Sequence, residues 1–410
     1  MPSADDTSAV QNSAAHHDSA DVGLLSPGWA GRPIATATGD SSVLAGILLF
    51  EVGLATVTAP NGVAQRILEA ARGIQPTQLL DGARADGNPV IPLLALLRSR
   101  LSDDDAAWLH RGATSQDALD TALVLMARDA AGLITADAQA AAARLCELAD
   151  AHRATVMTGR TLTQHSTPIT LGMKLAGWAY GVAAASASVR IAAAALPLQL
   201  GGASGTLASF VAADGTGAGL ATAERLAAEL GLPVPPAPWH VQRAPLTRFA
   251  DALAELTDAF GTIGANVALL ARSEIGELDA GAGGGSSAMP HKGNPVRAVL
   301  LNAAARQVPP LAAQLHAATV DERPDGAWHA EWQTLRTLLR TVGGAAATGR
   351  ELVQELRVHD DVIAAHVAAA APQLVSEAAK YGGAATPADY VGEADALTTR
   401  LIAAAREALA

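Results

Sequence analysis

The sequence predicts an all-α protein organised around a bundle of long helices, and its composition and proline spacing support this fold class. Half of the 410 residues are apolar, yet only 3% are aromatic. Alanine, the strongest helix former, supplies much of the apolar fraction, and the scarcity of aromatic residues argues against a β-sandwich or barrel. Prolines are absent from 93–167, 169–196 and 246–289, which leaves room for helices well above average length.

Within the stretch 118–151, apolar residues recur at steps of three and four, as one face of a helix requires. The residues of this stripe are Leu119, Ala122, Leu123, Met126 and Ala130. We expect a helix of about 25 residues or more there. We predict a disordered tail, an N-terminal helical domain, a central long-helix bundle and a short C-terminal helical domain, at residues 1–22, 23–112, 113–350 and 351–410.

The charge balance and the single cysteine limit the partners and the compartment. Twenty-eight basic and 40 acidic residues give a net charge of −12, which argues against broad binding to nucleic acid or to an anionic membrane. Cys146 cannot form an internal disulfide, so we expect a reducing cytoplasm and a buried, unreactive thiol. Residues 1–21 have no secretory pattern, and glycine and proline interrupt the longest uncharged run, 191–213. A soluble protein without a membrane span is expected.

The segment 281–295 carries the most chemistry. Four glycines precede Ser286 and Ser287, and Met289, Lys292 and Asn294 follow within ten residues. A flexible loop with a hydroxyl, a cation and an amide suits an anionic substrate whose carbon gains or loses a proton. The alternative, a solvated linker, would not need the run Met-Pro-His-Lys-Gly-Asn-Pro.

This loop, GSSAMPHKGNP, resembles the signature of the fumarase/aspartase superfamily. The resemblance implies a helical three-domain fold and a homotetramer whose active sites draw on three subunits. It also implies proton transfer next to a carboxylate through an aci-carboxylate intermediate. By resemblance Ser286 is the catalytic base, while Lys292 and Asn294 hold a substrate carboxylate and the intermediate. Whether Ser286 or Lys292 moves the proton stays open.

Two further segments agree with the same superfamily. Residues 110–117, HRGATSQD, resemble its HxGxTSxD stretch, in which His110, Thr114 and Ser115 would contact a substrate carboxylate at a helix start. Backbone N–H groups at a helix N-terminus suit an anion. The alternative is a plain Ser/Thr/Asp helix cap.

Residues 159–168, GRTLTQHSTP, resemble the GRTHxxxxTP segment, with one departure. Leu162 replaces a histidine that acts as general acid in many members, and Val299 replaces the glutamate that often pairs with it. Gln164 is a candidate hydrogen-bond donor to substrate. His165 could be a displaced acid, or an ordinary polar position on a helix.

The departures favour the 3-carboxy-cis,cis-muconate cycloisomerase branch, which the segments at 238–243, 321–332 and 387–397 also resemble. In lactonisation the nucleophile is a substrate carboxylate, already ionised at neutral pH, so no acid or base is needed for it. The resemblance implies conversion of 3-carboxy-cis,cis-muconate to 4-carboxymuconolactone in protocatechuate degradation (the β-ketoadipate pathway), without cofactor or metal. The alternatives are an adenylosuccinate-type lyase that releases fumarate and a catalytically silent structural homologue.

A tricarboxylate substrate requires local positive charge in an acidic protein. Lys292, Arg243 and Arg323 are the main candidates, with Arg160 as a further one. The sequence contains no P-loop, no strand-anchored GxGxxG and no metal-ligand spacing outside the N-terminal tail, so we expect neither a nucleotide nor a metal.

Overall fold

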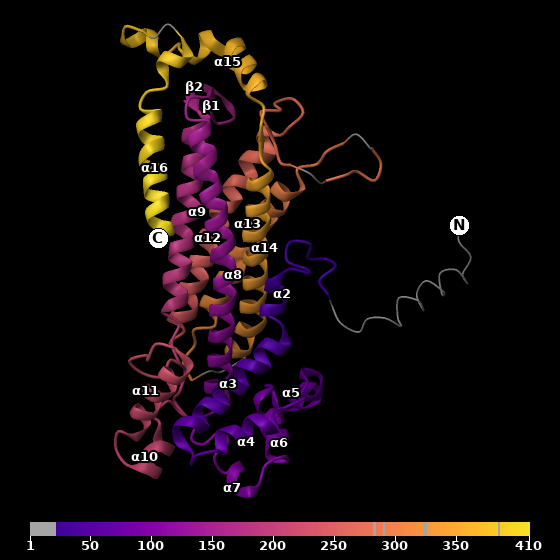
Figure 1. Cartoon of the computed structure of the whole chain (residues 1–410), viewed down its shortest axis with the longest axis vertical. Coiled ribbons are helices and arrows are strands. Elements are labelled where there is room, and N and C mark those ends of the chain that lie inside the picture. The colour runs from indigo at the N-terminus through magenta and orange to yellow at the C-terminus, as the bar shows by residue number, and fades with distance from the viewer. Residues whose placement is uncertain (1–21, 282–283, 290–291, 323–325, 384–385) are drawn as a thin grey trace, which may run out of the picture.

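The computed structural model describes residues 22–281, 284–289, 292–322, 326–383 and 386–410. All but the last residue of the predicted tail lie outside this part. Long helices run side by side along the length of the molecule (Figure 1). These are α8 (Ser115–Ala151), α9 (Leu171–Ala194), α12 (Ala244–Leu270), α13 (Val296–Ala317) and α14 (Ala327–Glu355). The prediction of a mostly helical chain is therefore confirmed.

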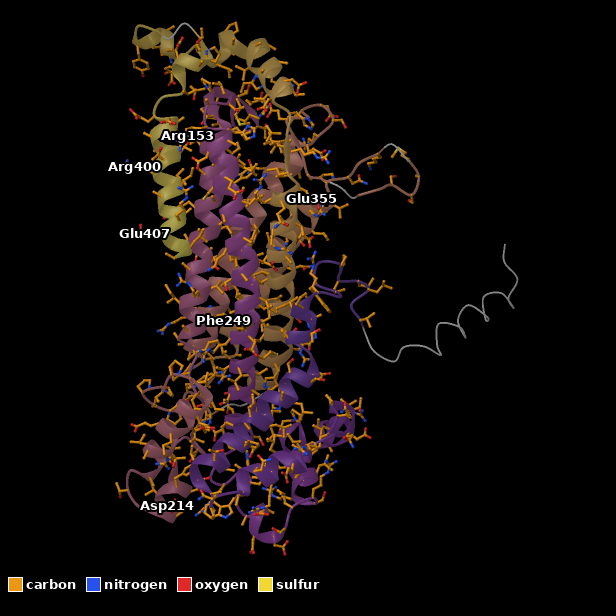
Figure 2. All side chains as sticks on the ribbon, viewed as in Figure 1. Arg153, Asp214, Phe249, Glu355, Arg400 and Glu407 are labelled. Atoms are coloured by element: carbon orange, nitrogen blue, oxygen red, sulfur yellow. The ribbon has the colours of Figure 1, made fainter. Side chains whose placement is uncertain are left out.

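The bundle is held by apolar faces that the helices turn toward one another. Helix α8 packs against α9 and α14, while α12 packs against α9, α13 and α14. Phe249 is fully buried inside the bundle, whereas the charged side chains of Arg400 and Glu407 lie on its surface (Figure 2). Helix α8 has 37 residues, longer than the expected minimum. Cys146 is buried in it, and burial raises the pKa of its thiol, as expected of an unreactive cysteine.

The N-terminal helices, together with α10 and α11, gather toward one end of the bundle, with α2 beside α8 and α14 (Figure 1). They are α2 (Pro33–Ala37), α3 (Asp40–Thr58), α4 (Val63–Ala70), the 3₁₀ helix Pro76–Leu79, α5 (Leu80–Asp86), α6 (Val90–Arg98), α7 (Asp103–Ala106), α10 (Ala208–Asp214) and α11 (Ala218–Leu230). Of the described helices, only α3 is long and apolar enough to cross a membrane, and 44% of its apolar window is buried inside the chain. It packs against α8 and α11.

The opposite end carries two small antiparallel sheets and the C-terminal helices. Strands β1 (Val156–Thr161) and β2 (Gln164–Thr170) form a hairpin, and β3 (Leu278–Asp279) pairs with β4 (Arg357–Val358). Beyond them lie α15 (Asp360–Leu374) and the 3₁₀ helices Ala378–Tyr381 and Pro387–Tyr390. The chain then turns back into α16 (Ala394–Leu409), which packs along α9 (Figure 1).

The hairpin corrects one expectation. His165 does not lie on a helix; it is exposed on β2, opposite Arg160. The turn is formed by Leu162 and Thr163, whose φ angles are 49° and 66°. Two consecutive residues with positive φ match the twist of a two-residue hairpin turn.

Candidate active site

The described parts of the loop between β3 and α13, residues 284–289 and 292–295, project away from the bundle (Figure 1). The base of this loop is closed by Asn294, whose backbone N–H and side-chain amide both donate to the carbonyl of Gly284, at 2.9 and 3.0 Å. Gly284 has a φ of 79°, and a Cβ there would collide with the Asn294 carbonyl, so this position requires glycine. The side-chain amide that the resemblance assigns to substrate thus also holds the loop closed.

Ser286 is half-buried, and its Oγ accepts from the backbone N–H groups of Ala288 (3.4 Å) and Met289 (3.1 Å). Backbone donors aimed at a hydroxyl oxygen stabilise negative charge on it. Such an environment suits a proton-transfer group. Ser287, Met289 and Lys292 are exposed on the same loop.

The hairpin and the start of this loop meet through an ion pair. Glu277, fully buried just before β3, accepts from the Arg160 guanidinium at 2.6 and 2.9 Å. His366 of α15 lies 2.8 Å from the same carboxylate. Burial raises the pKa of Glu277, but Arg160 and His366 together hold it below its usual range. The charge of Arg160 is therefore compensated within the chain, so Arg160 is not a free cation for substrate.

A second half-buried cation lies near this pair. Lys174, at the start of α9, is 3.3 Å from the Asn266 side-chain oxygen. Burial lowers the pKa of its ammonium group, and the nearby Arg160 charge lowers it further. Gln164 and Leu162 are exposed on the hairpin, with Leu162 95% exposed at the turn.

The segment 110–117 lies at the opposite end of the bundle from the loop and the hairpin. Thr114 caps α8, and the Asp117 carboxylate accepts from the Thr114 backbone N–H at 2.9 Å. The cap that we considered as an alternative therefore exists, next to His110 and Ser115. Since α8 has 37 residues, about 55 Å separates its two ends. One chain thus brings the hairpin and the loop base together but leaves 110–115 far from both.

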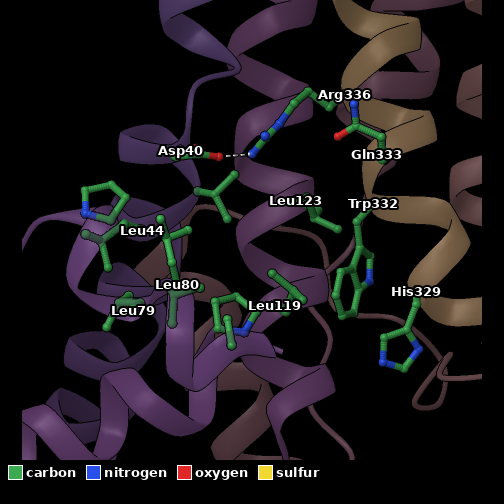
Figure 3. Close-up of a pocket in the computed structure, with 15 residues that line it drawn as sticks. Asp40, Leu44, Leu79, Leu80, Leu119, Leu123, His329, Trp332, Gln333 and Arg336 are labelled. Carbon is green, nitrogen blue, oxygen red and sulfur yellow. Dashed lines mark ion pairs between the residues drawn. The ribbon is translucent and has the colours of Figure 1, made fainter. Parts of the chain in front are cut away.

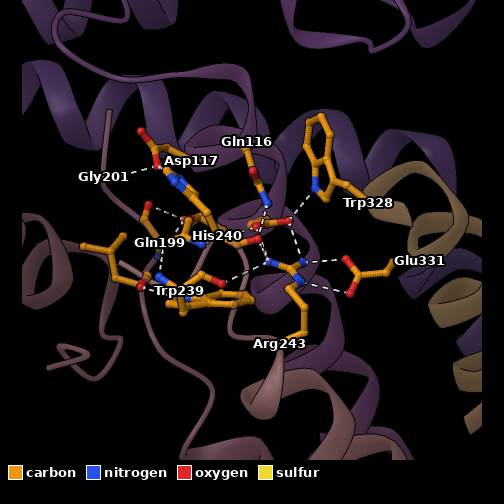
Figure 4. A network of polar contacts seen from close by, with 12 residues as sticks. Gln116, Asp117, Gln199, Gly201, Trp239, His240, Arg243, Trp328 and Glu331 are labelled. Carbon is orange, nitrogen blue, oxygen red and sulfur yellow. Dashed lines mark hydrogen bonds and ion pairs between the residues drawn. The ribbon is translucent and has the colours of Figure 1, made fainter. Parts of the chain in front are cut away.

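A buried polar network surrounds this end of α8 (Figure 4). Asp117 accepts from the backbone N–H groups of Gly201 and Gly202, both at 2.9 Å, and lies 2.7 Å from His240 Nε2. Asp120 accepts from the Trp328 indole N–H at 2.9 Å. These contacts fix the start of α8 rigidly against 199–202 and α14.

Arg243, which we predicted to bind substrate, belongs to the same network. Its side chain is 2% exposed and makes two-pronged ion pairs with Asp120 and Glu331. Two carboxylates saturate the guanidinium, so within this chain Arg243 holds the network together, and the predicted contact with substrate would compete with these ion pairs. Burial, reinforced by the Asp120 charge, raises the pKa of Glu331 to about 7 even though Arg243 opposes the shift.

Sequence reasoning missed Glu51, which lies inside α3 with its carboxylate 2.6 Å from His110 Nδ1. The available signal was a lone acidic residue within the apolar run 43–57. Glu277 was missed because its partners are far apart in the sequence. Arg323 lies outside the described residues. Among those that are described, no group of three or more His, Cys, Asp or Glu side chains is arranged to hold a metal ion.

An apolar pocket of about 270 Å³ lies between α3, α5, α8 and α14 (Figure 3). Leucines and Trp332 line it, and an ion pair between Asp40 and Arg336 (2.7 Å) stands at one side. The described residues that we predicted for the site do not line this pocket, and its apolar walls do not suit a tricarboxylate.

Comparison with known proteins gives a consistent result. The family model described as "Lyase" matches residues 88–309. The chain is 44% identical over 398 residues to nitrosuccinate lyase of Streptomyces davaonensis, covering 93% of this chain and 84% of the relative. It is 42% identical over 342 residues to 3-carboxy-cis,cis-muconate cycloisomerase of Pseudomonas aeruginosa, covering 80% and 73%. The crystal structure of the 3-carboxy-cis,cis-muconate lactonizing enzyme from Pseudomonas putida matches with a TM-score of 0.84 at 31% identity, over 92% of this chain and 97% of that one.

Proposed function

Because this chain belongs to the lyase family of the fumarase/aspartase superfamily, we propose that it transfers a proton at a carbon next to a substrate carboxylate while a stable anion adds or departs at the neighbouring carbon. The observation that carries this proposal is Leu162. A hydrocarbon occupies the exposed turn where related segments place a histidine acid, so a leaving group that needs protonation would find no donor there.

We take the substrate to be 3-carboxy-cis,cis-muconate, lactonised to 4-carboxymuconolactone in protocatechuate degradation. A substrate carboxylate oxygen bonds to a diene carbon, and a proton is added at the carbon next to another carboxylate. The attacking carboxylate is ionised at neutral pH and needs no activation. The similarity to cycloisomerases in sequence and structure supports this choice.

In this proposal Ser286 or Lys292 transfers the proton, and the remaining groups bind carboxylates. Asn294, Ser287 and Met289 act from the same loop; His110, Thr114, Ser115 and Gln164 act from the other two segments. Because about 55 Å separates the ends of α8, the segment 110–115 would meet the loop and the hairpin only between subunits. We therefore propose a homotetramer with shared active sites, located in the cytoplasm.

A second candidate reaction is the cleavage of nitrosuccinate. The identity to nitrosuccinate lyase over 93% of this chain favours it. Elimination would remove a proton next to one carboxylate and expel nitrite, leaving fumarate. Nitrite, like a carboxylate, departs as a stable anion, so Leu162 is compatible with both reactions. An adenylosuccinate-type reaction would expel an amine and is disfavoured for the same reason.

The experiment compares three substrates with purified protein. 3-Carboxy-cis,cis-muconate is followed by loss of diene absorbance, nitrosuccinate by nitrite release, and adenylosuccinate by absorbance. We expect turnover of the first, with kcat/KM at least tenfold above the other two. Faster nitrite release would establish the second candidate. Turnover of adenylosuccinate alone would overturn the proposal, and silence with all three would favour a structural homologue.

Substitution of Ser286 tests the loop directly. Ser286→Ala should lower kcat by roughly 10²- to 10⁴-fold, the range for a lost proton-transfer group, with an unchanged melting temperature. Ser99→Ala, an exposed serine in the N-terminal region, serves as the control and should keep full activity. Near-normal turnover by Ser286→Ala would remove Ser286 from the mechanism.

A further inference from the structure

Glu51 is a charged residue in a place where packing alone would select an apolar one. It lies in the middle of α3 and its side chain is 0% exposed. Removing a carboxylate from water costs several kcal/mol unless its partners compensate the charge. Its Oε1 is 2.6 Å from His110 Nδ1, while Oε2 has no hydrogen-bond partner among the described residues. A buried carboxylate with one oxygen that accepts no hydrogen bond contributes little to stability by itself.

The partner histidine is held in a strained backbone conformation. His110 has a φ of 59° although it is not glycine, a left-handed backbone conformation that residues with a side chain disfavour. Gly112 follows with a φ of 78°, and a Cβ there would lie 2.8 Å from the Phe210 ring. Strain of this kind concentrates at functional sites, where the surrounding structure enforces it. Here it directs the ring of His110 to Glu51, four residues before the Thr114 cap.

We propose that Glu51 is the positioning residue for His110. An ionised carboxylate can only accept a hydrogen bond, so Nδ1 of His110 must carry the proton. This fixes the orientation of the ring and leaves Nε2 as the nitrogen available to a ligand. Once protonated at both nitrogens, the ring would donate to Glu51 and to a substrate carboxylate at the start of α8. The inference rests on the proposed function, in which His110, Thr114 and Ser115 bind substrate.

A purely structural role makes a different prediction. If Glu51 only joins α3 to 110–112, its loss would weaken folding and affect activity equally whether or not the imidazole of His110 is present. If it acts through His110, its loss would have no further effect once the imidazole is gone. A double-mutant cycle separates the two cases.

The first experiment measures kcat/KM for Glu51→Gln, His110→Gln and the double variant. We expect each single variant to lose roughly ten- to hundredfold, the range for removing a carboxylate that orients a functional histidine. The double variant should be no worse than His110→Gln. Asp105→Asn is the matched control, since Asp105 is a buried carboxylate of the same region that pairs with Arg66. It should lose stability, and its effect on kcat/KM should be the same in the wild-type and His110→Gln backgrounds. Equal losses from Glu51→Gln in both backgrounds would overturn the proposal.

Chemical rescue supplies the second readout. His110→Gly suits the positive φ at this position, and the relief of backbone strain offsets part of the cost of leaving Glu51 without its partner until imidazole is added. Added imidazole should restore part of kcat when Glu51 is present to orient it, and should restore none in the His110→Gly/Glu51→Gln variant. Equal rescue in both backgrounds would contradict a positioning role.

Calorimetry with the unreactive tricarboxylate tricarballylate distinguishes failure of this inference from failure of the proposed function. If no substrate is turned over, the dissociation constant of tricarballylate replaces kcat/KM in the same cycle. We expect Glu51→Gln to weaken binding only when His110 is present. Additive effects on binding would overturn the inference whatever the reaction proves to be.

Discussion

At the scale of single residues, the buried carboxylates are the most informative side chains of this chain. Glu51, Asp117, Asp120, Glu277 and Glu331 are all at most 1% exposed, and each contacts an arginine or a histidine. Buried ion pairs contribute little net stability, because desolvation offsets their attraction. Their positions, at the two ends of the bundle and beside the functional segments, indicate that they fix the geometry of those segments.

Glu331 gives a pH dependence that can be measured. Burial, together with Asp120, raises its pKa to about 7, above the value of 4.5 expected when unfolded. The folded protein keeps this proton at pH values where the unfolded chain has lost it. The stabilising contribution is therefore fully present below pH 4.5 and is lost as the pH rises through 7, by up to about 3 kcal/mol.

Denaturant unfolding of the wild type and of Glu331→Gln between pH 5 and 8 tests whether the free energy of unfolding falls as the pH rises. The amide cannot titrate but keeps a hydrogen bond to Arg243. The wild type should lose stability relative to the variant as the pH rises. If the difference in stability between wild type and variant stayed constant over this range, or changed in the opposite direction, the raised pKa of Glu331 would be contradicted.

At the scale of elements, the long helices could be predicted from the sequence because their signals are local. Helical periodicity within a proline-free run predicts α8, and the proline-free, apolar runs 169–196 and 246–289 leave room for α9 and α12. The hairpin could not be predicted, because its turn uses Leu162 and Thr163 at positive φ and lacks the Asn-Gly or Asp-Gly signal.

For the candidate site, too, only those features that depend on a short stretch of sequence could be predicted. Motifs identified Ser286, the cap at Thr114 and the departure at Leu162, since each lies within a short stretch of sequence. The pairing of Glu51 with His110 spans 59 positions, and that of Arg160 with Glu277 spans 117. Such pairs depend on tertiary packing. The saturation of Arg243 was invisible for the same reason, because its partners lie on α8 and α14.

Packing between helices yields a prediction from two glycines. A Cβ at Gly349 of α14 would collide with the ring of Phe260, which is fully buried on α12, whereas a Cβ at Gly132 of α8 meets nothing. Gly349→Ala should destabilise by about 1–2 kcal/mol, as overpacking outweighs the better helix propensity of alanine. Gly132→Ala should stabilise by up to about 1 kcal/mol. If Gly349→Ala raised the melting temperature as Gly132→Ala does, α12 and α14 would have to separate at that contact without cost.

At the scale of the whole molecule, the bundle acts as a spacer between the functional segments. The network of Asp117, Asp120 and Arg243 fixes the segment 110–115 at one end, and the pair of Arg160 and Glu277 ties the hairpin to the loop base at the other. A rigid 37-residue helix joins these ends. Closed symmetric assembly can bring opposite ends of different copies together, so the proposed function predicts that activity requires assembly.

Mixing two impaired variants tests that requirement. Ser286→Ala chains keep an intact His110, and His110→Gln chains keep an intact Ser286. If a site takes these residues from different subunits, random mixing in equal amounts makes about a quarter of the sites intact, since each of two contributing chains is correct half the time. Coexpressed variants should therefore regain about a quarter of wild-type activity.

A mixture of Ser286→Ala with the Ser286→Ala/His110→Gln double variant contains no intact loop and should regain none. If the first mixture forms mixed oligomers, shown by two affinity tags, but is no more active than its parents, then the segments do not meet between subunits. The separation along α8 would then need another explanation.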